Sequence, residues 1–170
     1  MLHDLSLPTA LGAPSSTFRL RNATDDDLDA LMLLLSDDPI SAIRGDLSSA
    51  ADRPAYLEAL RAITADPANA LLVVVDASDT VVATMQLTRI PGMARRGSTR
   101  LLVEAVGVRS DQRSNGIGGA MMRWVTDVAC GDLDVHLVQL TSDAARVDAH
   151  RFYERLGFTG SHVGFKYRVS

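Results

Sequence analysis

One segment joins a strand pattern, a polar loop and a helix pattern, and it constrains the fold more than any other. Residues 104–119 read EAVGVRSDQRSNGIGG, with the strand pattern ending at Val108 and Gly116 opening the helix pattern. Such a unit aims free backbone N–H groups at one point, where the helix dipole adds positive potential. Glycines let the backbone approach an anion closely. The segment therefore predicts a cradle for phosphate or pyrophosphate.

This predicted cradle differs from two well-known phosphate loops. No Lys-Ser or Lys-Thr pair follows the glycines, so the segment is not a P-loop. Met121 stands where a dinucleotide fingerprint would place its third glycine. Taken alone, the segment is also compatible with a glycine-containing helix start that binds nothing.

Composition excludes several other classes of protein. The chain has 170 residues, of which 46% are apolar and 22% charged, as is typical of one globular domain. The net charge of −4 disfavours a nucleic-acid partner, because phosphate neutralisation needs a basic surface. Cys130 is the only cysteine, which excludes an internal disulfide and a cysteine-based zinc site. Its apolar surroundings predict a small buried residue rather than a nucleophile.

The sequence shows no membrane or targeting signal. The longest apolar runs, residues 31–35 and 71–75, fall far below the ~18 residues that a spanning helix needs. No Lys or Arg precedes the apolar residues of the N-terminus, which Asp4 and Pro8 interrupt. We therefore expect no membrane partner and a cytoplasmic protein, with residues 1–16 forming a flexible tail.

Hydrophobic periodicity predicts alternating strands and helices in one domain, residues 17–170. Strands are expected at 17–21, 71–75, 81–90, 99–108 and 135–140, with two short strands within 158–169. Helices are expected at 24–35, 53–64, 117–129 and 144–156, the first of them with a charged first turn at Asp25 to Asp27. The order βααβββαβαββ predicts an α/β fold with a mixed, mostly antiparallel central sheet flanked by helices.

Two separated motifs resemble those of the GNAT superfamily of acyl-CoA-dependent N-acetyltransferases. The first is Arg113-Ser-Asn-Gly116-Ile-Gly118, which fits (Arg/Gln)-x-x-Gly-x-(Gly/Ala). The second is Phe152-Tyr153-Glu-Arg-Leu-Gly157-Phe158, on a later predicted helix, which fits Phe-Tyr-x-x-x-Gly-Phe. The predicted element order also matches that of the family, so the resemblance covers residues 17–170.

This resemblance implies acetyl-CoA as co-substrate, with its pyrophosphate on the loop of the first motif. That loop consists of Arg113, Ser114, Asn115, Gly116, Ile117, Gly118 and Gly119. The pantetheine arm would pair with the backbone of Val106 and Val108, where the family's strand splays from its neighbour. Arg146 stands where many members carry an asparagine that touches the arm, which puts that contact in doubt. Arg146 could reach a phosphate of CoA instead.

The resemblance also implies a direct attack of the acceptor amine on the thioester, which requires no metal. Tyr153 would be the general acid that protonates the departing thiolate, and Glu104 the general base. A half-buried core tyrosine and an exposed or arginine-paired carboxylate are the alternatives. Thr141 stands where some members carry another base, which favours Glu104 or water. His150 could relay a proton.

The acceptor is the open question at the level of sequence. Arg89, Arg95, Arg96 and Arg100 form a local positive patch, which favours a small amine that also carries a carboxylate, phosphate or phosphonate. A solvated basic loop is the alternative. Residues 148–153 and 161–162 resemble the C-terminal part of aminoalkylphosphonate acetyltransferases.

Other acceptors and another class of function stay open at this level. A protein lysine or N-terminus, a cationic aminoglycoside and a non-catalytic acyl-CoA sensor are the competing functions. Many family members form homodimers, so a homodimer is also open.

Overall fold

A six-stranded sheet forms the centre of the molecule in the computed structural model, which describes residues 1–13, 16–43, 45 and 47–169. Its strands are β1 (Thr9–Ala13), β2 (Ser16–Asn22), β3 (Asn69–Val75), β4 (Val81–Ile90), β5 (Arg100–Val108) and β6 (Val138–Leu140). They lie in chain order, and every neighbouring pair is antiparallel except β5 and β6. The predicted α/β class with a mixed, mostly antiparallel sheet is confirmed.

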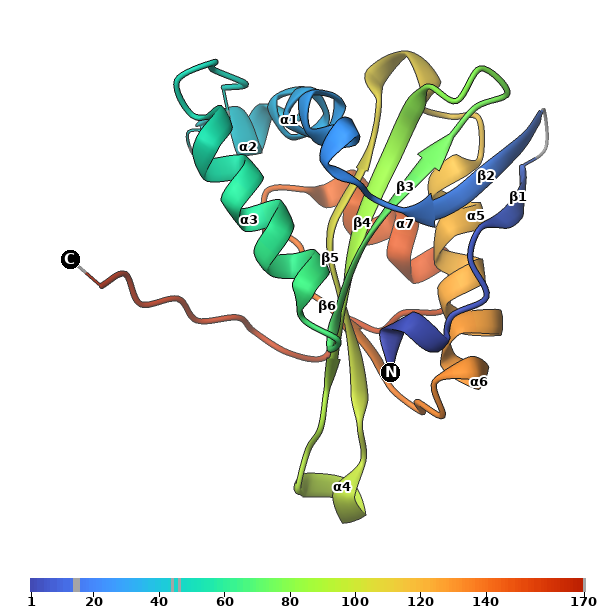
Figure 1. Cartoon of the computed structure of the whole chain (residues 1–170). Coiled ribbons are helices and arrows are strands. Elements are labelled where there is room, and N and C mark those ends of the chain that lie inside the picture. The colour runs from blue at the N-terminus through green and yellow to red at the C-terminus, as the bar shows by residue number, and fades with distance from the viewer. Residues whose placement is uncertain (14–15, 44, 46, 170) are drawn as a thin grey trace.

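Helices cover both faces of this sheet (Figure 1). One face carries α1 (Leu28–Ser36), α2 (Pro39–Ile43) and α3 (Arg53–Ala65). The other carries α7 (Val147–Arg155) and the rod of α5 (Ile117–Trp124), a π-helical turn (Val125–Ala129) and α6 (Cys130–Asp132). The four predicted helices are therefore present, with their ends shifted by a few residues. No helix among the described residues is long and apolar enough to cross a membrane.

Strand β3 divides the core between the two faces. Leu72 and Val74 pack in the larger cluster, against α5, whereas Val73 and Val75 pack in the cluster under α1 and α3. This division follows from the period of two in a strand, because successive side chains point to opposite faces. Cys130 is half-buried against the larger cluster, and its burial raises the pKa of the thiol.

The start of α1 is fixed by a buried charge. Asp27 is 5% exposed and accepts two hydrogen bonds from the guanidinium of Arg21, at 2.7 and 2.8 Å, and one from the backbone of Thr24. Burial alone would raise the pKa of Asp27, but these bonds outweigh it and hold the pKa below its ordinary value. The acidic first turn thus ties α1 to β2.

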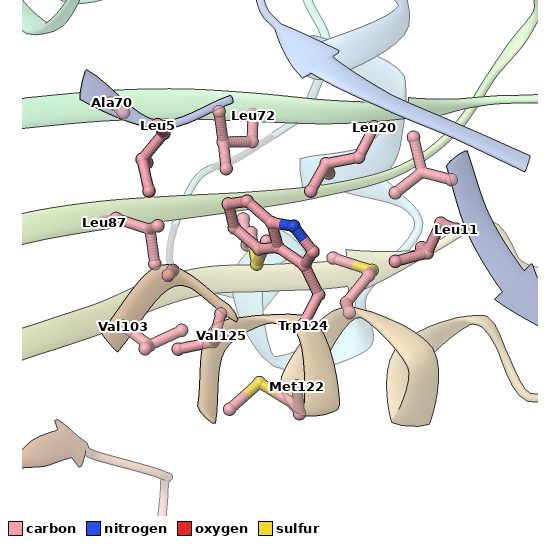
Figure 2. Close-up of a cluster of buried hydrophobic side chains, with 14 of the residues drawn as sticks. Leu5, Leu11, Leu20, Ala70, Leu72, Leu87, Val103, Met122, Trp124 and Val125 are labelled. Carbon is pink, nitrogen blue, oxygen red and sulfur yellow. The ribbon is translucent and has the colours of Figure 1, made fainter. Parts of the chain in front are cut away.

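The N-terminal residues are part of the domain, so the predicted flexible tail over residues 1–16 is wrong for the described residues 1–13. A 3₁₀ turn at Leu2–Asp4 precedes β1, which pairs with β2. Leu2, Leu5 and Leu11 are at most 6% exposed. Figure 2 shows Leu5 and Leu11 among the side chains around Trp124. The sequence positions of these three leucines do not follow a single helix or strand period. Their common burial therefore depends on how the sheet packs.

The C-terminal residues also differ from expectation. The two short strands predicted within 158–169 are absent, since the described residues from 158 to 169 form neither helix nor strand. Figure 1 shows this segment extending away from the rest of the molecule. The strand predicted at 135–140 shortens to the three residues of β6. The observed order therefore gains a first strand and lacks the last two.

Candidate active site

A β-bulge in β5 is the structural centre of the candidate site. Thr84 of β4 pairs with Gly107 and Gln86 pairs with Glu104, so two residues of β5 lie opposite one of β4. Ala105, one of the two, has a left-handed φ of +49°. The extra residue reverses the alternation of the strand, because Val106 joins the core on the α5 side while Glu104 faces the opposite side.

The sheet opens beside this bulge. Strand β6 pairs with β5 only from Leu101 to Val103, and the last pair is Val103 with Leu140. From Glu104 to Val108, the β6-facing edge of β5 has no strand partner among the described residues. An extended ligand can hydrogen-bond to such an edge as an added strand would. This opening lies where the family resemblance places the pantetheine arm, at Val106 and Val108.

The loop after β5 leads into the first turn of α5, where the sequence predicts a phosphate cradle. Ser114 and Gly116 adopt left-handed φ values of +66° and +80°, which turn the chain into the first turn of α5. The N–H groups of Ile117, Gly118 and Gly119 belong to that turn and have no partner within the helix. A turn of this kind concentrates N–H groups toward an anion. Asn115 stabilises the loop by donating to Gln112 at 3.3 Å.

Gly118 has a packing role besides any role in binding. A Cβ placed on it would lie 3.4 Å from Cζ of Phe152 and 3.7 Å from Cγ2 of Val108. The start of α5 therefore approaches α7 and β5 closely enough that a larger side chain would displace them. The first motif thus contacts the second through this glycine, about forty residues apart in sequence.

Arg113 is turned away from the cradle in the structure. Its Nε donates to the carbonyl oxygen of Val108 at 3.1 Å, and its terminal nitrogen lies 3.3 Å from both the carbonyl and a carboxylate oxygen of Asp37. Asp37 also accepts a 2.7 Å hydrogen bond from the backbone of Ser110. The C-terminal end of α1 thereby holds the loop, and the expected charge on a pyrophosphate would require Arg113 to reorient.

Arg146 is paired with Asp38, the residue that follows Asp37. It caps the N-terminus of α7, and its guanidinium donates two hydrogen bonds to Asp38, at 2.7 and 2.5 Å. Asp38 also accepts from the backbone of Ser41 at 2.7 Å. Burial opposes ionisation of Asp38, but these bonds outweigh it and lower its pKa. A contact of Arg146 with CoA, as expected from the sequence, would have to compete with this pair.

Tyr153 lies half-buried on α7 between two other rings. Its centroid is 5.1 Å from that of Phe152 and 5.9 Å from that of Phe158, both edge-to-face. Burial raises the pKa of the Tyr153 phenol, and the charge of Arg146 opposes this in part. The phenol therefore stays protonated at neutral pH and retains a proton that it can donate.

The second motif also has a structural explanation. Gly157 has a φ of +88°, its N–H bonds to the carbonyl of Glu154, and the N–H of Phe158 bonds to the carbonyl of Tyr153. These two hydrogen bonds form a Schellman motif at the end of α7. The apolar contact that usually accompanies this motif is made here by Tyr153 and Phe158. The motif thus returns the ring of Phe158 onto Tyr153 and fixes the position of that ring.

Glu104 lies on the face opposite the cradle and is exposed. Among the described residues, no hydrogen bond or ion pair engages its carboxylate, so the arginine-paired alternative does not hold there. The Nε2 atom of His150 instead lies 2.9 Å from the carbonyl oxygen of Asp143, a contact that supports the start of α7. Thr141 is exposed after the end of β6.

A row of polar side chains continues from Glu104 along the same face, and sequence reasoning missed it. Gln86 and Thr88 donate to the amide oxygen of Asn69 at 3.3 and 2.6 Å, and Gln139 and Arg100 extend the row. Along β4 these polar residues alternate with apolar ones, and this alternation could have identified the polar row from the sequence.

The four arginines predicted as one positive patch do not share a single surface, although Arg95 and Arg100 line the same hollow beside the hairpin. Arg89 pairs with Leu101 on the α5 side, whereas Arg100 shares the face of Glu104. Arg95 and Arg96 lie in the short α4 (Ala94–Gly97) at the hairpin tip, which Figure 1 shows at the far end of β5 from the cradle. Only Arg100 lies in the row that includes Glu104.

Two surface hollows lie outside the cradle. One of about 520 Å³ lies at the outer end of β1 and β2, lined by Phe18, Arg19 and Asp79 among others. None of the predicted site residues lines it. The other, of about 340 Å³, lies beside the hairpin and is lined by Arg95, Arg100, Leu137, Gln139 and His162 among others. The second hollow therefore adjoins the polar row.

Comparisons with known proteins give a matching family model and several similar structures. The model of the acetyltransferase (GNAT) family matches residues 29–158. A transcriptional regulator from Bacillus halodurans C-125 is 34% identical, with a TM-score of 0.84 over 89% of this chain and 99% of its own.

Two less similar structures share the fold. They are an acetyltransferase from Trypanosoma brucei (19% identity, TM-score 0.70, 89% and 99% covered) and glucosamine-6-phosphate N-acetyltransferase from Arabidopsis thaliana (16%, 0.72, 91% and 100%). No curated protein sequence matches the chain. The matched family model covers both motifs and the β5 bulge, so the chain belongs to the acetyltransferase (GNAT) family.

Proposed function

We propose that this protein transfers the acetyl group of acetyl-CoA to the primary amine of a small molecule that also carries an acidic group. The observation that carries the proposal is the opening between β5 and β6 beyond Val103, next to the bulge at Ala105. It connects the face that holds the cradle and Tyr153 with the face that holds Glu104. A thioester bound from one side can there meet an amine bound from the other.

The described residues fit acetyl-CoA, which supplies the activated acetyl thioester. The first-turn N–H groups of α5 suit a pyrophosphate. The edge of β5 at Val106 and Val108, which has no strand partner among the described residues, suits an extended amide-containing arm. Gly118 allows the start of α5 to pack closely against α7, because a Cβ there would already contact the ring of Phe152. The residues of the cradle therefore hold and orient the donor.

The acceptor nitrogen loses two protons in all, one before it attacks and one as the amide forms, and the sulfur gains one. The second nitrogen proton restores the phenol of Tyr153 after that phenol has protonated the sulfur. An ammonium group has no lone pair, so the acceptor must lose a proton before its nitrogen attacks, and the carboxylate of Glu104 accepts that proton directly or through water. The phenol of Tyr153 donates a proton to the departing thiolate. Its raised pKa keeps that proton in place until negative charge develops on the sulfur.

The acidic group of the acceptor would bind at Arg100. Arg100 and Glu104 lie four residues apart on the same face, or about 13 Å along a strand. Among the described residues, no hydrogen bond or ion pair engages the guanidinium of Arg100. Gln86, Thr88 and Gln139 lie between or beside the two charges and offer hydrogen bonds. The row therefore fits a short acceptor with its amine at one end and an acid at the other.

A panel of matched amines tests this proposal. Each skeleton is supplied with and without a carboxylate, phosphate or phosphonate, and a lysine-containing peptide is included. We expect acetyl-CoA-dependent acetylation of acidic small amines, measured by thiol release and by mass spectrometry of the product. Turnover of the peptide alone would identify a protein acetyltransferase, and binding of acetyl-CoA without any turnover would identify a sensor.

A further inference from the structure

The two arginines that the family resemblance places near CoA are both held by acids of the chain itself. Arg113 contacts Asp37 and Arg146 contacts Asp38, and these consecutive acids directly follow α1. A carboxylate and a phosphate compete for the same guanidinium, because both are anionic acceptors of its N–H groups. Each carboxylate therefore engages a cation that a phosphate of CoA would need.

The two pairs differ in geometry and in exposure. Asp38 accepts two hydrogen bonds from Arg146, at 2.7 and 2.5 Å, and a third from the backbone of Ser41. Arg113 instead approaches a single carboxylate oxygen of Asp37, at 3.3 Å, and its side chain is 50% exposed. A short bidentate pair is strong, whereas an exposed pair with one long contact contributes little. The Asp37–Arg113 pair is therefore the one that can exchange its anion.

Asp37 keeps a second contact with the loop before α5. The carboxylate oxygen that faces Arg113 also accepts a 2.7 Å hydrogen bond from the backbone N–H of Ser110. This bond does not involve the arginine, so the carboxylate remains against the loop if Arg113 turns away. Arg113 itself lies three residues before Gly116, the N-cap of α5, and thus beside the first turn that suits a pyrophosphate.

We propose that Asp37 is an internal competitor of acetyl-CoA, whose carboxylate holds Arg113 until the pyrophosphate of the donor displaces it. Binding then requires the existing ion pair to break, so Asp37 lowers the affinity for acetyl-CoA instead of supporting it. The inference rests on the proposed function, because it takes acetyl-CoA as the donor and the first turn of α5 as the pyrophosphate site. It assigns control of donor affinity to the end of α1, on the opposite face of the sheet from α5 (Figure 1).

The affinity for acetyl-CoA, measured by calorimetry on the full chain, tests the competition. Asp37→Asn keeps an oxygen that can accept from Ser110 but removes the charge that holds Arg113. It should lower the Kd about three- to fivefold, the change that corresponds to an exposed ion pair. Asp29→Asn is the control, since Asp29 lies on the same helix and pairs with Arg53, and it should leave the Kd unchanged. An Asp37→Asn variant that binds acetyl-CoA equally or more weakly would overturn the proposal, because Asp37 would then only support the loop.

Removal of the arginine tests whether the effect passes through Arg113. Arg113→Ala alone should weaken the binding of acetyl-CoA. Asp37→Asn added to Arg113→Ala should give no further gain in affinity, since no guanidinium remains to be released. A gain of equal size in both backgrounds would overturn the competition, because the carboxylate would then act on the donor through its charge alone.

A crystal structure of the wild type with acetyl-CoA tests the exchange without any substitution. Arg113 should contact the pyrophosphate and lie beyond ion-pair distance of Asp37, and a pair that persists in the complex would contradict the inference. A wild type that binds no acetyl-CoA would contradict the proposed function and the inference together. A wild type that acetylates an amine, with no tighter binding of acetyl-CoA by Asp37→Asn, would contradict the inference alone.

Discussion

The two sides of the β5 bulge differ in how their charged groups are engaged. On the side of the cradle, Arg113 is bound to Asp37 and Arg146 to Asp38. On the opposite side, neither Glu104 nor Arg100 has a hydrogen bond or ion pair among the described residues. Both sides are built on the same sheet, so the difference lies in what the neighbouring elements supply.

The arginines on the side of the cradle are thus paired within the protein, whereas Glu104 and Arg100 on the opposite side are available to a ligand. Asp37 and Asp38 follow α1, which covers the face of Glu104, yet they bind arginines that belong to the loop and to α7. The two acids therefore join the layers on either side of the opening. Glu104 is exposed and Arg100 is partly buried, and neither charge is paired among the described residues, so an acceptor of opposite charge pattern can bind without first breaking an ion pair.

The largest effect is expected on the cradle side, at Tyr153. Replacing Tyr153 with Phe keeps the ring between Phe152 and Phe158 but removes the proton that the leaving group needs. We expect kcat to fall by roughly 10²–10⁴-fold while acetyl-CoA binding, measured by calorimetry, stays unchanged. Tyr167→Phe is the matched control and should keep full activity. A Tyr153→Phe enzyme at full rate would require a different acid.

The next effect concerns Glu104 on the open side. Glu104→Gln should lower kcat/KM about 100-fold at neutral pH, because solvent must then deprotonate the acceptor. The loss should shrink as the pH rises, since a larger fraction of the amine is then neutral. Glu58→Gln, at an exposed position of α3, serves as control. An unchanged pH–rate profile would remove Glu104 from the mechanism.

Arg100 tests whether the open side selects an acidic acceptor. Arg100→Ala should raise KM about tenfold or more for an acidic amine, the loss expected for a charge-assisted hydrogen bond, and leave KM for its neutral analogue unchanged. Arg89→Ala is matched in charge but lies on the opposite face, so it should change neither value. Equal effects of both variants would indicate general electrostatic attraction rather than a binding site.

The smallest effect is a stability effect of the Asp38–Arg146 pair. Asp38→Asn should lower the free energy of unfolding by about 1–2 kcal/mol at pH 7, measured by denaturant titration. Because the folded-state pKa of Asp38 is lowered, its contribution is present above the ordinary pKa of the carboxyl and is lost as the pH falls through the lowered value. The difference from wild type should therefore vanish in acid.

The exposed pair of Asp29 with Arg53 provides the control for that measurement. Its side chains are 73% and 48% exposed, so Asp29→Asn should change stability by well under 1 kcal/mol. If Asp38→Asn and Asp29→Asn lower the free energy of unfolding equally, the Asp38–Arg146 pair contributes no more to stability than an exposed ion pair.

Local features of the site could be predicted from the sequence because they depend on nearby residues. The glycines fix the turn into α5, and Gly157 fixes the end of α7 and the contact of Phe158 with Tyr153. The paired acids could not be predicted, since Asp37 lies 76 residues from Arg113 and Asp38 lies 108 residues from Arg146. Such contacts depend on how the layers pack.

The two chain termini show the same limit. Leu2 and Leu5 were interpreted as part of a tail because Asp4 and Pro8 break the local pattern, yet the packed sheet buries both leucines. The alternating C-terminal residues were predicted to form two short strands, but the described residues 158–169 form none, because an alternating pattern does not by itself provide a neighbouring strand. The family resemblance implied a strand that splays at Val106 and Val108, but not the left-handed φ of Ala105, because alanine is not a residue that favours that conformation.

The central claim is that the opening beside the bulge brings an acetyl thioester and a small acidic amine together. Its most direct test measures, in one reaction, the CoA thiol released and the acetylated amine formed. The account predicts equal amounts of the two, both dependent on the amine and both strongly reduced by Tyr153→Phe. Thiol release that does not depend on the amine, or acetyl-CoA binding with no acetylated amine, would contradict it.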